Sequence, residues 1–217
     1  MAKIRKIDRT PANGRRNYFL VDASFLANNY IEPALAPAGR ERLRIEACQE
    51  WWQEIHHQLD AGTARVYVPD ICIAESFKVL AKKYYTQHWF QTPAAFSGAR
   101  RRLARDITMP AKLLKAQRRT VRFHDVSTSR DIIIAVDRFY ELFMKSDLTV
   151  SLPDLIIVST AKYLIDFFDV PKSLLHIVTL DRNLRAGTKK IPELPNAYDP
   201  TEAPDAVAKV FRDAPPA

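Results

Sequence analysis

Three short apolar segments, each followed by a helical pattern, constrain the fold of this chain more than any other feature. The segments at 17–21, 64–68 and 174–180 are rich in aromatic and β-branched residues, so they predict buried strands. Steps of three and four between apolar residues, helped by capping signals, predict helices at 24–30, 41–59, 70–85, 132–145 and 154–168. Strands that alternate with helices pair in parallel. The pattern therefore predicts an α/β fold, a three-layer α/β/α sandwich with a mostly parallel central sheet.

The length favours one domain with insertions over two separate cores, because 217 residues barely exceed the usual size of one domain. We expect a basic leader at 1–16 and a single α/β domain at 17–191. Helical insertions are expected at about 31–60 and 86–130. The Pro- and Ala-rich segment 192–217 is expected to be a C-terminal tail on the surface.

Two features bear on the compartment. The sequence has no apolar run long enough to cross a bilayer, and its charged N-terminus is not followed by a hydrophobic segment. Cys48 and Cys72 fall inside apolar helical patterns, so they are interpreted as core thiols of a reducing compartment. We therefore expect a cytoplasmic protein with no membrane contact.

The positive charge of the chain is concentrated in one window. The net charge is +8, and the segment 100–122 holds nine Lys or Arg against the single acid Asp106. Such a block can bind backbone phosphates, since it displaces their condensed counterions, although a solvated helix face is an equally ordinary interpretation. The candidate phosphate ligands are Arg100, Arg101, Arg102, Arg105, Arg118 and Arg119.

Four acids mark a candidate site. Asp22 and Asp181 follow predicted strands, whereas Glu75 and Asp154 lie in predicted helices. In sheets of this kind ligands bind beyond the carboxyl ends of the strands. Carboxylates that meet there repel one another unless a hard divalent cation such as Mg²⁺ or Mn²⁺ neutralises them. A metal so bound can activate water for phosphodiester hydrolysis without a histidine base.

Each acid also has an ordinary structural interpretation. Asp22 and Asp181 could simply start turns after strands. Asp154 lies three residues after Ser151, a spacing typical of a capping box at a helix N-terminus. Glu75 could pair with a lysine of its own helix. The order of the four acids along the chain distinguishes the interpretations better than any one of them.

That order resembles the PIN-domain family, which includes the toxin nucleases of bacterial toxin–antitoxin pairs. FLVDASFL is similar to its first motif, with Asp22 and then Ser24, and VPDICIAESFKVL to its second, with Glu75. SLPDLIIVSTAKYL is similar to the third motif, with Asp154. IVTLDRNL is similar to the fourth, with Thr179 and Asp181. Each motif is short, but the four occur in order on the expected elements.

The resemblance implies endonucleolytic cleavage of RNA that depends on Mg²⁺ or Mn²⁺, held by Asp22, Glu75, Asp154 and Asp181. It further implies a possible antitoxin partner and frequent dimerisation, and with RNA as the substrate the arginine block becomes a candidate RNA-binding surface. Ser24, Thr179 and Asn183 are the expected supporting residues. Asn183 stands where many members carry a further acid, which weakens the case for a second metal. The alternative is a PIN scaffold without activity that binds RNA or a protein partner.

Overall fold

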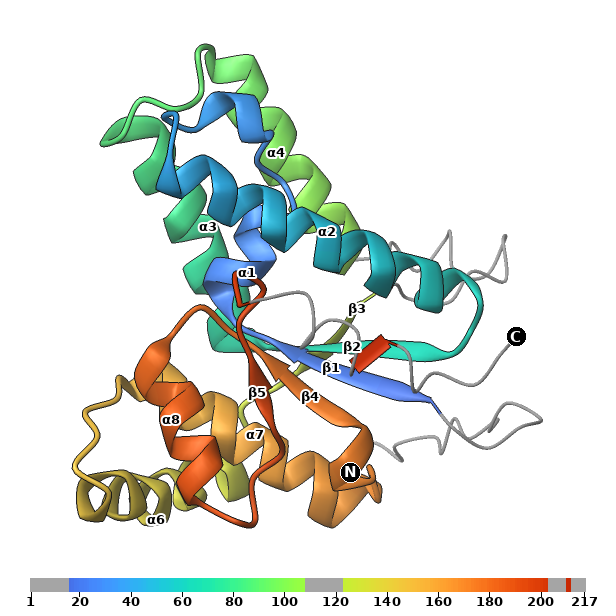
Figure 1. Ribbon diagram of the computed structural model, residues 1–217, viewed down its shortest axis with the longest axis vertical. Coiled ribbons are helices and arrows are strands. Elements are labelled where there is room, and N and C mark those ends of the chain that lie inside the picture. The colour runs from blue at the N-terminus through green and yellow to red at the C-terminus, as the bar shows by residue number, and fades with distance from the viewer. Residues whose placement is uncertain (1–15, 108–122, 203–209, 212–217) are drawn as a thin grey trace.

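The computed structural model describes residues 16–107, 123–202 and 210–211, and it is built around a five-stranded sheet (Figure 1). All neighbouring strands are parallel, in the order β3-β2-β1-β4-β5. The strands are β1 (Asn17–Val21), β2 (Ala64–Pro69), β3 (Phe123–Val126), β4 (Leu175–Val178) and β5 (Ala197–Tyr198). The α/β fold with a parallel sheet, expected from the sequence, is confirmed.

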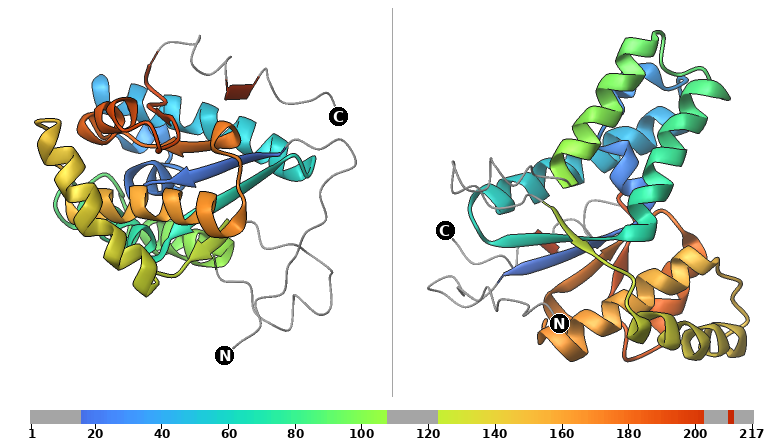
Figure 2. Two further views of the ribbon diagram at one scale, coloured as in Figure 1. Left: turned by 90° about the horizontal axis from the view of Figure 1, so that it is seen from below. Right: turned by 180° about the vertical axis from the view of Figure 1, so that it is seen from behind.

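Helices cover both faces of the sheet (Figure 2). In Figure 1, α1, α2, α3 and α4 lie above the strands, and α6, α7 and α8 lie below them. Two single 3₁₀ turns, η1 (Pro33–Leu35) and η2 (Lys172–Leu174), add to these. The helices are α1 (Ala23–Asn28), α2 (Arg40–Asp60), α3 (Asp70–Tyr85), α4 (Pro93–Ile107), α6 (Arg130–Lys145), α7 (Leu152–Phe168) and α8 (Arg182–Lys190). The predicted helices agree with these bounds to within a few residues.

The packing of α2 shows why its apolar period matters. Trp51, Trp52 and Ile55 recur at helical spacing and are at most 1% exposed. The Trp52 ring stacks on Phe25 with 4.7 Å between centroids, and its indole N–H donates to the Phe25 carbonyl at 3.0 Å. Burial of both aromatic rings together with this donor fixes α2 against α1. The helix thus forms part of the layer that covers the sheet.

Strand β1 lies at the centre of the sheet, so the residue that follows it, Asp22, lies in the middle of the carboxyl edge of the sheet. Phe19 pairs with Val66 of β2 on one side and with His176 of β4 on the other. Directly after β1, the backbone N–H of Asp22 donates to the Val178 carbonyl at 3.1 Å. The ends of β1 and β4 are therefore tied together at the edge where ligands bind in such folds.

The described part of the 192–217 segment is not the surface tail that its composition suggested. Ala197–Tyr198 forms edge strand β5, because β4 offers an unpaired edge for backbone hydrogen bonds. Leu194 is 3% exposed, and Phe211 packs its ring on Phe19 and Trp51. Likewise, the segment 86–130 contributes strand β3 to the other edge. The basic leader lies outside the described residues, except for Arg16.

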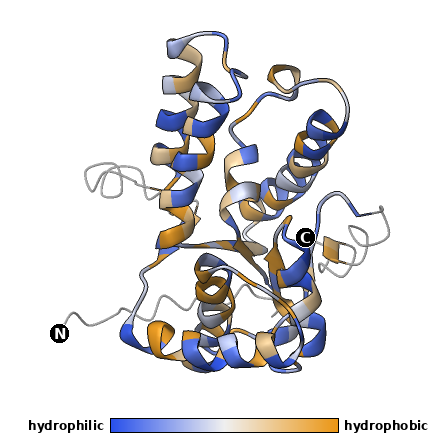
Figure 3. Ribbon diagram, turned by 90° about the vertical axis from the view of Figure 1, so that its left-hand side faces the viewer, coloured by the Kyte–Doolittle hydropathy of each residue, from blue (hydrophilic) through white to orange (hydrophobic). Residues whose placement is uncertain are grey.

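The lower layer is two helices deep beneath part of the sheet. Helix α7 packs on the strands, and α6 packs along α7. Alternating polar and apolar residues run along the helices that face the viewer in Figure 3, as expected for elements buried on one side. Gly187 of α8 lies so close to Phe143 of α6 that a Cβ would come within 2.1 Å of Cε1 of that ring. Among the described residues, no helix is long and apolar enough to span a membrane.

Candidate active site

A cavity of about 360 Å³ opens at the carboxyl ends of β1 and β4. Its walls come from the start of α1, the N-terminal part of α2, one face of α3, the start of α7 and the loop after β4. The four acids singled out in the sequence all line it: Asp22, Glu75, Asp154 and Asp181. Residues from distant parts of the sequence are therefore brought to one place by the parallel sheet.

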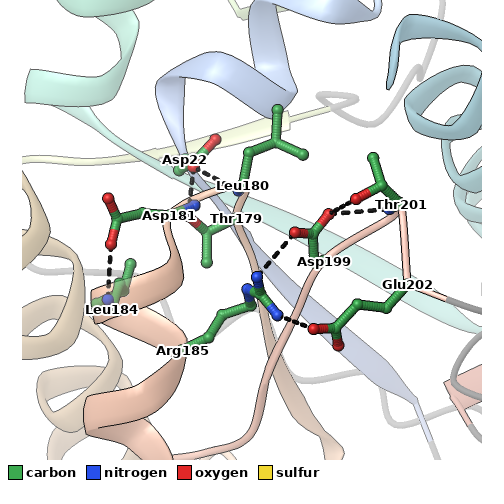
Figure 4. Close-up of polar contacts among 9 residues, drawn as sticks. All are labelled: Asp22, Thr179, Leu180, Asp181, Leu184, Arg185, Asp199, Thr201 and Glu202. Carbon is green, nitrogen blue, oxygen red and sulfur yellow. Dashed lines mark hydrogen bonds and ion pairs between the residues drawn. The ribbon is translucent and has the colours of Figure 1, made fainter. Parts of the chain in front are cut away.

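Asp22 is the most buried of the four, with 7% of the residue exposed. Its Oδ2 accepts hydrogen bonds from the Thr179 hydroxyl and from the Leu180 N–H at 3.2 Å (Figure 4). Its Oδ1 caps α1 by accepting from the Phe25 N–H at 2.6 Å. Burial raises the pKa of Asp22 from 3.8 to about 6, although the three hydrogen bonds oppose the rise and the charge of Asp154 adds to it. A cation in the cavity would relieve this cost.

Asp154 caps a helix and also faces the cavity. The Ser151 hydroxyl accepts from the Asp154 N–H at 3.4 Å, and Asp154 Oδ2 accepts from the Ser151 N–H at 3.0 Å. This is the capping box expected from the sequence. Burial raises the pKa of Asp154, and the negative charge of Asp181 adds to the rise, whereas the hydrogen bonds from Ser151 oppose it. The capping and site interpretations are therefore compatible, because the bonds to Ser151 use one carboxylate oxygen and leave the other.

Asp181 and Glu75 complete the acidic wall from opposite layers. Asp181 Oδ1 caps α8 by accepting from the Leu184 N–H at 2.7 Å (Figure 4). The Thr179 hydroxyl oxygen accepts a hydrogen bond from the Asp181 N–H at 3.0 Å, and the same hydroxyl donates a hydrogen bond to Asp22. Thr179 therefore links the two acids. Glu75 projects from the middle of α3 and is half-buried. Three of the four acids thus come from the ends of strands or helices, where the backbone holds them.

The donors fit a hard divalent cation by their chemistry. Within the described residues, Asp154 Oδ1, Asp181 Oδ2 and both carboxylate oxygens of Glu75 accept no hydrogen bond, so they are available as ligands. The acids are spread along the cavity wall. No three His, Cys, Asp or Glu side chains in the described ranges are grouped tightly enough to hold an ion as they stand. Ion binding would therefore draw the carboxylates inward from the positions they occupy here.

The supporting residues expected from the motifs differ in their placement. Ser24 lines the cavity beside Asp22, and Thr179 donates its hydroxyl proton to Asp22. Asn183 instead donates its side-chain amide to the Thr149 carbonyl at 2.7 Å. It ties α8 to the loop before α7 and does not line the cavity. Its contribution is to hold together the two elements that carry Asp154 and Asp181.

Sequence reasoning missed the opposite wall of the cavity. Asn28, Glu41, Arg44 and Lys83 all line it. Glu41 and Arg44 are three residues apart on α2, and the Arg44 guanidinium lies 3.4 Å from the Glu41 carboxylate. These residues have no motif of their own, since charged residues at such spacing are usual on solvated helix faces. Only the approach of α2 to α3 brings them to the site.

Part of the arginine block on α4 is occupied by contacts within the fold. Arg102 donates to the Tyr30 carbonyl at 3.2 Å, and Arg100 lies 5.4 Å from the Phe96 ring centroid. Arg101 and Arg105 are exposed on the same helix, and Arg105 Nε lies 3.7 Å from the Asp106 carboxylate. Arg118 and Arg119 lie outside the described residues. Among the described arginines of the block, Arg101 makes no such contact, so it is the most available phosphate ligand on this helix.

A second polar group missed in the sequence lies behind the acids (Figure 4). Arg185 of α8 forms ion pairs with Asp199, at 2.9 Å, and with Glu202. Asp199 is 7% exposed and also accepts from the Thr201 N–H at 2.9 Å and hydroxyl at 2.7 Å. Because the side chains of Arg185 and Asp199 are both largely buried, this group anchors the chain after β5 to the helix that Asp181 caps.

No family profile matches the sequence, and no curated protein does. Solved structures do resemble the fold. FitAcB from Neisseria gonorrhoeae aligns with a TM-score of 0.51 and 14% identity, over 85% of this chain and 99% of that one. FitAB bound to the IR36 DNA fragment gives 0.51 and 13%, over 85% and 96%. VapBC2 from Rickettsia felis, bound to a DNA fragment from its promoter, gives 0.46 and 12%, over 84% and 98%.

The two FitAB structures, both with a TM-score of 0.51, share the α/β fold of this chain. The resemblance to the PIN-domain family expected from the four motifs is thereby confirmed at the level of the fold. The chain has a PIN-like α/β/α fold, and the likeness extends over nearly the whole length of the FitAB chains that align with it.

Proposed function

We propose that this chain is a metal-dependent endoribonuclease of the PIN type and the toxin of a toxin–antitoxin pair. The observation that carries the proposal is the convergence of Asp22, Glu75, Asp154 and Asp181 on one cavity at the carboxyl edge of the sheet. Each of the four belongs to a different sequence motif, and the motifs lie on four different elements. Acids scattered for capping or solubility alone would have no reason to share a cavity.

The four acids would hold Mg²⁺ or Mn²⁺, which when bound activates water and neutralises charge on the phosphate. Asp22 would contribute through Oδ1, which accepts a single hydrogen bond and so keeps a lone pair, while Thr179, Leu180 and Phe25 hold its carboxylate in one orientation. Asp154 and Asp181 are oriented by their capping bonds. Such orientation limits the rearrangement that the site undergoes when substrate arrives.

The structures with a similar fold support the proposal that this chain has an antitoxin partner. FitAB, whose fold this chain shares, is a toxin–antitoxin complex and is bound to DNA in one of the aligned structures. An antitoxin that covers the cavity would explain how a cell tolerates the nuclease. Exposed apolar residues on α6 and α7, such as Ile133, Tyr140 and Phe167, offer surface for that partner or for a second copy of the chain.

The test is cleavage of a labelled single-stranded RNA in EDTA, in Mg²⁺ and in Mn²⁺, with the wild-type protein and with Asp22→Asn. We expect cleavage by wild type only with a divalent ion, and a loss on the order of a hundredfold or more in the variant, as is typical when transition-state charge stabilisation is removed. A matched control is Asp137→Asn, which neutralises an exposed carboxylate of α6 outside the cavity. RNA binding without cleavage in any ion would favour the alternative, an inactive PIN scaffold that binds RNA.

A further inference from the structure

At the end of the cavity away from Asp22, basic side chains line the wall, in contrast to the acids at the other end. Glu75, Val79 and Lys83 line it from one face of α3, four residues apart. Eight residues of helix separate Glu75 from Lys83 by about 12 Å along the axis. Arg44 of α2 lines the same end as Lys83. The cavity is therefore acidic at one end, whereas the other end carries two cations and the single carboxylate of Glu41.

Lys83 is held in place by an aromatic ring rather than by an ion pair. Its Nζ lies 3.4 Å from the ring centroid of Trp89, which is 6% exposed. In the ranges that the structure describes, this ammonium forms no ion pair. Burial lowers the pKa of Lys83 to about 8, although the charge of Glu41 opposes the drop. The ammonium has lost water and the charge of Glu41 offsets this only in part, so an anion bound in the cavity would stabilise it further.

Arg44 has hydrogen-bonding capacity to spare. Its one ion pair, with Glu41, is 3.4 Å long and joins side chains that are 34% and 41% exposed. A guanidinium carries five N–H donors in a planar fork suited to phosphate, and this pair uses only one nitrogen of Arg44. Arg44 also lies close enough to Lys83 for their charges to repel. A shared anion between them would reverse that repulsion.

We propose that Arg44 and Lys83 form a phosphate seat that binds a backbone phosphate of single-stranded RNA next to the one that is cleaved. This inference rests on the proposed nuclease function, because the acids define where the scissile phosphate lies. The strand would then run from the ends of β1 and β4 along α3, between α2 and α3. A carboxylate of a protein partner would meet the same two cations, and competition by poly-glutamate distinguishes such a partner from RNA.

The measurement is the affinity for a labelled single-stranded RNA oligonucleotide in EDTA, by fluorescence anisotropy over a range of KCl concentrations. We expect Lys83→Gln and Arg44→Gln each to weaken binding about tenfold, as for loss of a charge-assisted hydrogen bond. The slope of log affinity against log salt should fall by about 0.7 for each phosphate interaction removed. Lys82→Gln is the matched control, because it removes the same charge from the next residue, which is exposed and outside the cavity.

Cleavage in Mn²⁺ is measured on the same proteins, so that the two proposals can fail separately. Wild-type cleavage, with both variants binding RNA like wild type, would overturn the phosphate seat and leave the nuclease intact. Equal losses in Lys82→Gln would also overturn it, since they would mean a general charge effect. Wild type that neither binds nor cleaves RNA would remove both proposals. Unchanged RNA affinity, with loss of competition by poly-glutamate in the variants, would overturn the seat for RNA and assign the two cations to a protein partner.

Discussion

Replacing Asp22 by asparagine should make the metal-free protein more stable at neutral pH and less stable in acid. Burial holds the pKa of Asp22 at about 6, against 3.8 for the ordinary group. The folded state therefore binds this proton more tightly than the unfolded state does. The contribution of Asp22 to wild-type stability should fall by roughly 3 kcal/mol as the pH rises from about 4 to about 6, and stay level above that. The Asp22→Asn side chain cannot ionise, so the variant lacks this fall.

The substitution also has a cost that does not vary with pH. Asparagine keeps one acceptor, which can serve the Phe25 N–H, but its amide NH₂ would then face the N–H of Leu180. One unsatisfied buried donor costs about 1–2 kcal/mol. The variant should thus be about 1–2 kcal/mol less stable than wild type near pH 4 and about 1–2 kcal/mol more stable near pH 7. The two stability curves should cross between these values.

Urea unfolding from pH 4 to pH 8 measures this, with tryptophan fluorescence as the probe, because Trp52 stacks on the ring of Phe25. Repeating it with Mn²⁺ should stabilise wild type at pH 7 by about 2.7 kcal/mol at a hundred times the dissociation constant, and the variant by less. A difference between the proteins that stays constant from pH 4 to pH 7 would refute the reasoning about burial. Equal stabilisation of both proteins by Mn²⁺ would place the ion elsewhere.

Two further perturbations test the packing around the site. Burial lowers the pKa of His176 from 6.5 to about 4, so the contribution of His176 to wild-type stability should fall by about 3 kcal/mol as the pH falls through that window, and in thermal melts His176→Gln should gain on wild type over the same window. Gly187→Ala should cost about 1–3 kcal/mol in urea unfolding, because the new methyl meets the buried Phe143 ring, whereas Gly98→Ala on α4 meets nothing within 4 Å and should be neutral or stabilising. Equal effects of the two alanines would show that the Phe143 ring yields freely.

The sequence by itself determined the elements whose signal is local. The apolar runs of β1, β2 and β4 and the helical periods of α2, α3, α6 and α7 appear in the structure close to their expected bounds. It also singled out the four acids, because each occurs beside an element end or within a short motif. The capping box of Ser151 and Asp154 was visible for the same reason, since it depends on residues three positions apart.

Tertiary structure decided what depends on distant partners. The strand Ala197–Tyr198 is two residues long and has no pattern of its own, so it exists only because β4 leaves an edge to pair with. Strand β3 is short and follows a basic segment, so its apolar residues give no clear strand signal in the sequence. It forms because its backbone pairs in parallel with β2. The buried position of Phe211 likewise depends on the space between Phe19 and Trp51.

The same distinction separates the two walls of the cavity. Glu75 belongs to a motif, but Lys83, two turns later on the same helix, looks in sequence like any solvated lysine. Its contact with Trp89 arises from the turn after α3, and its proximity to Arg44 arises only because α2 and α3 line the same cavity. Local sequence determines which face of a helix a side chain occupies. What that face meets, and therefore whether a charge is solvated or functional, is decided by the packing of elements far apart in the chain.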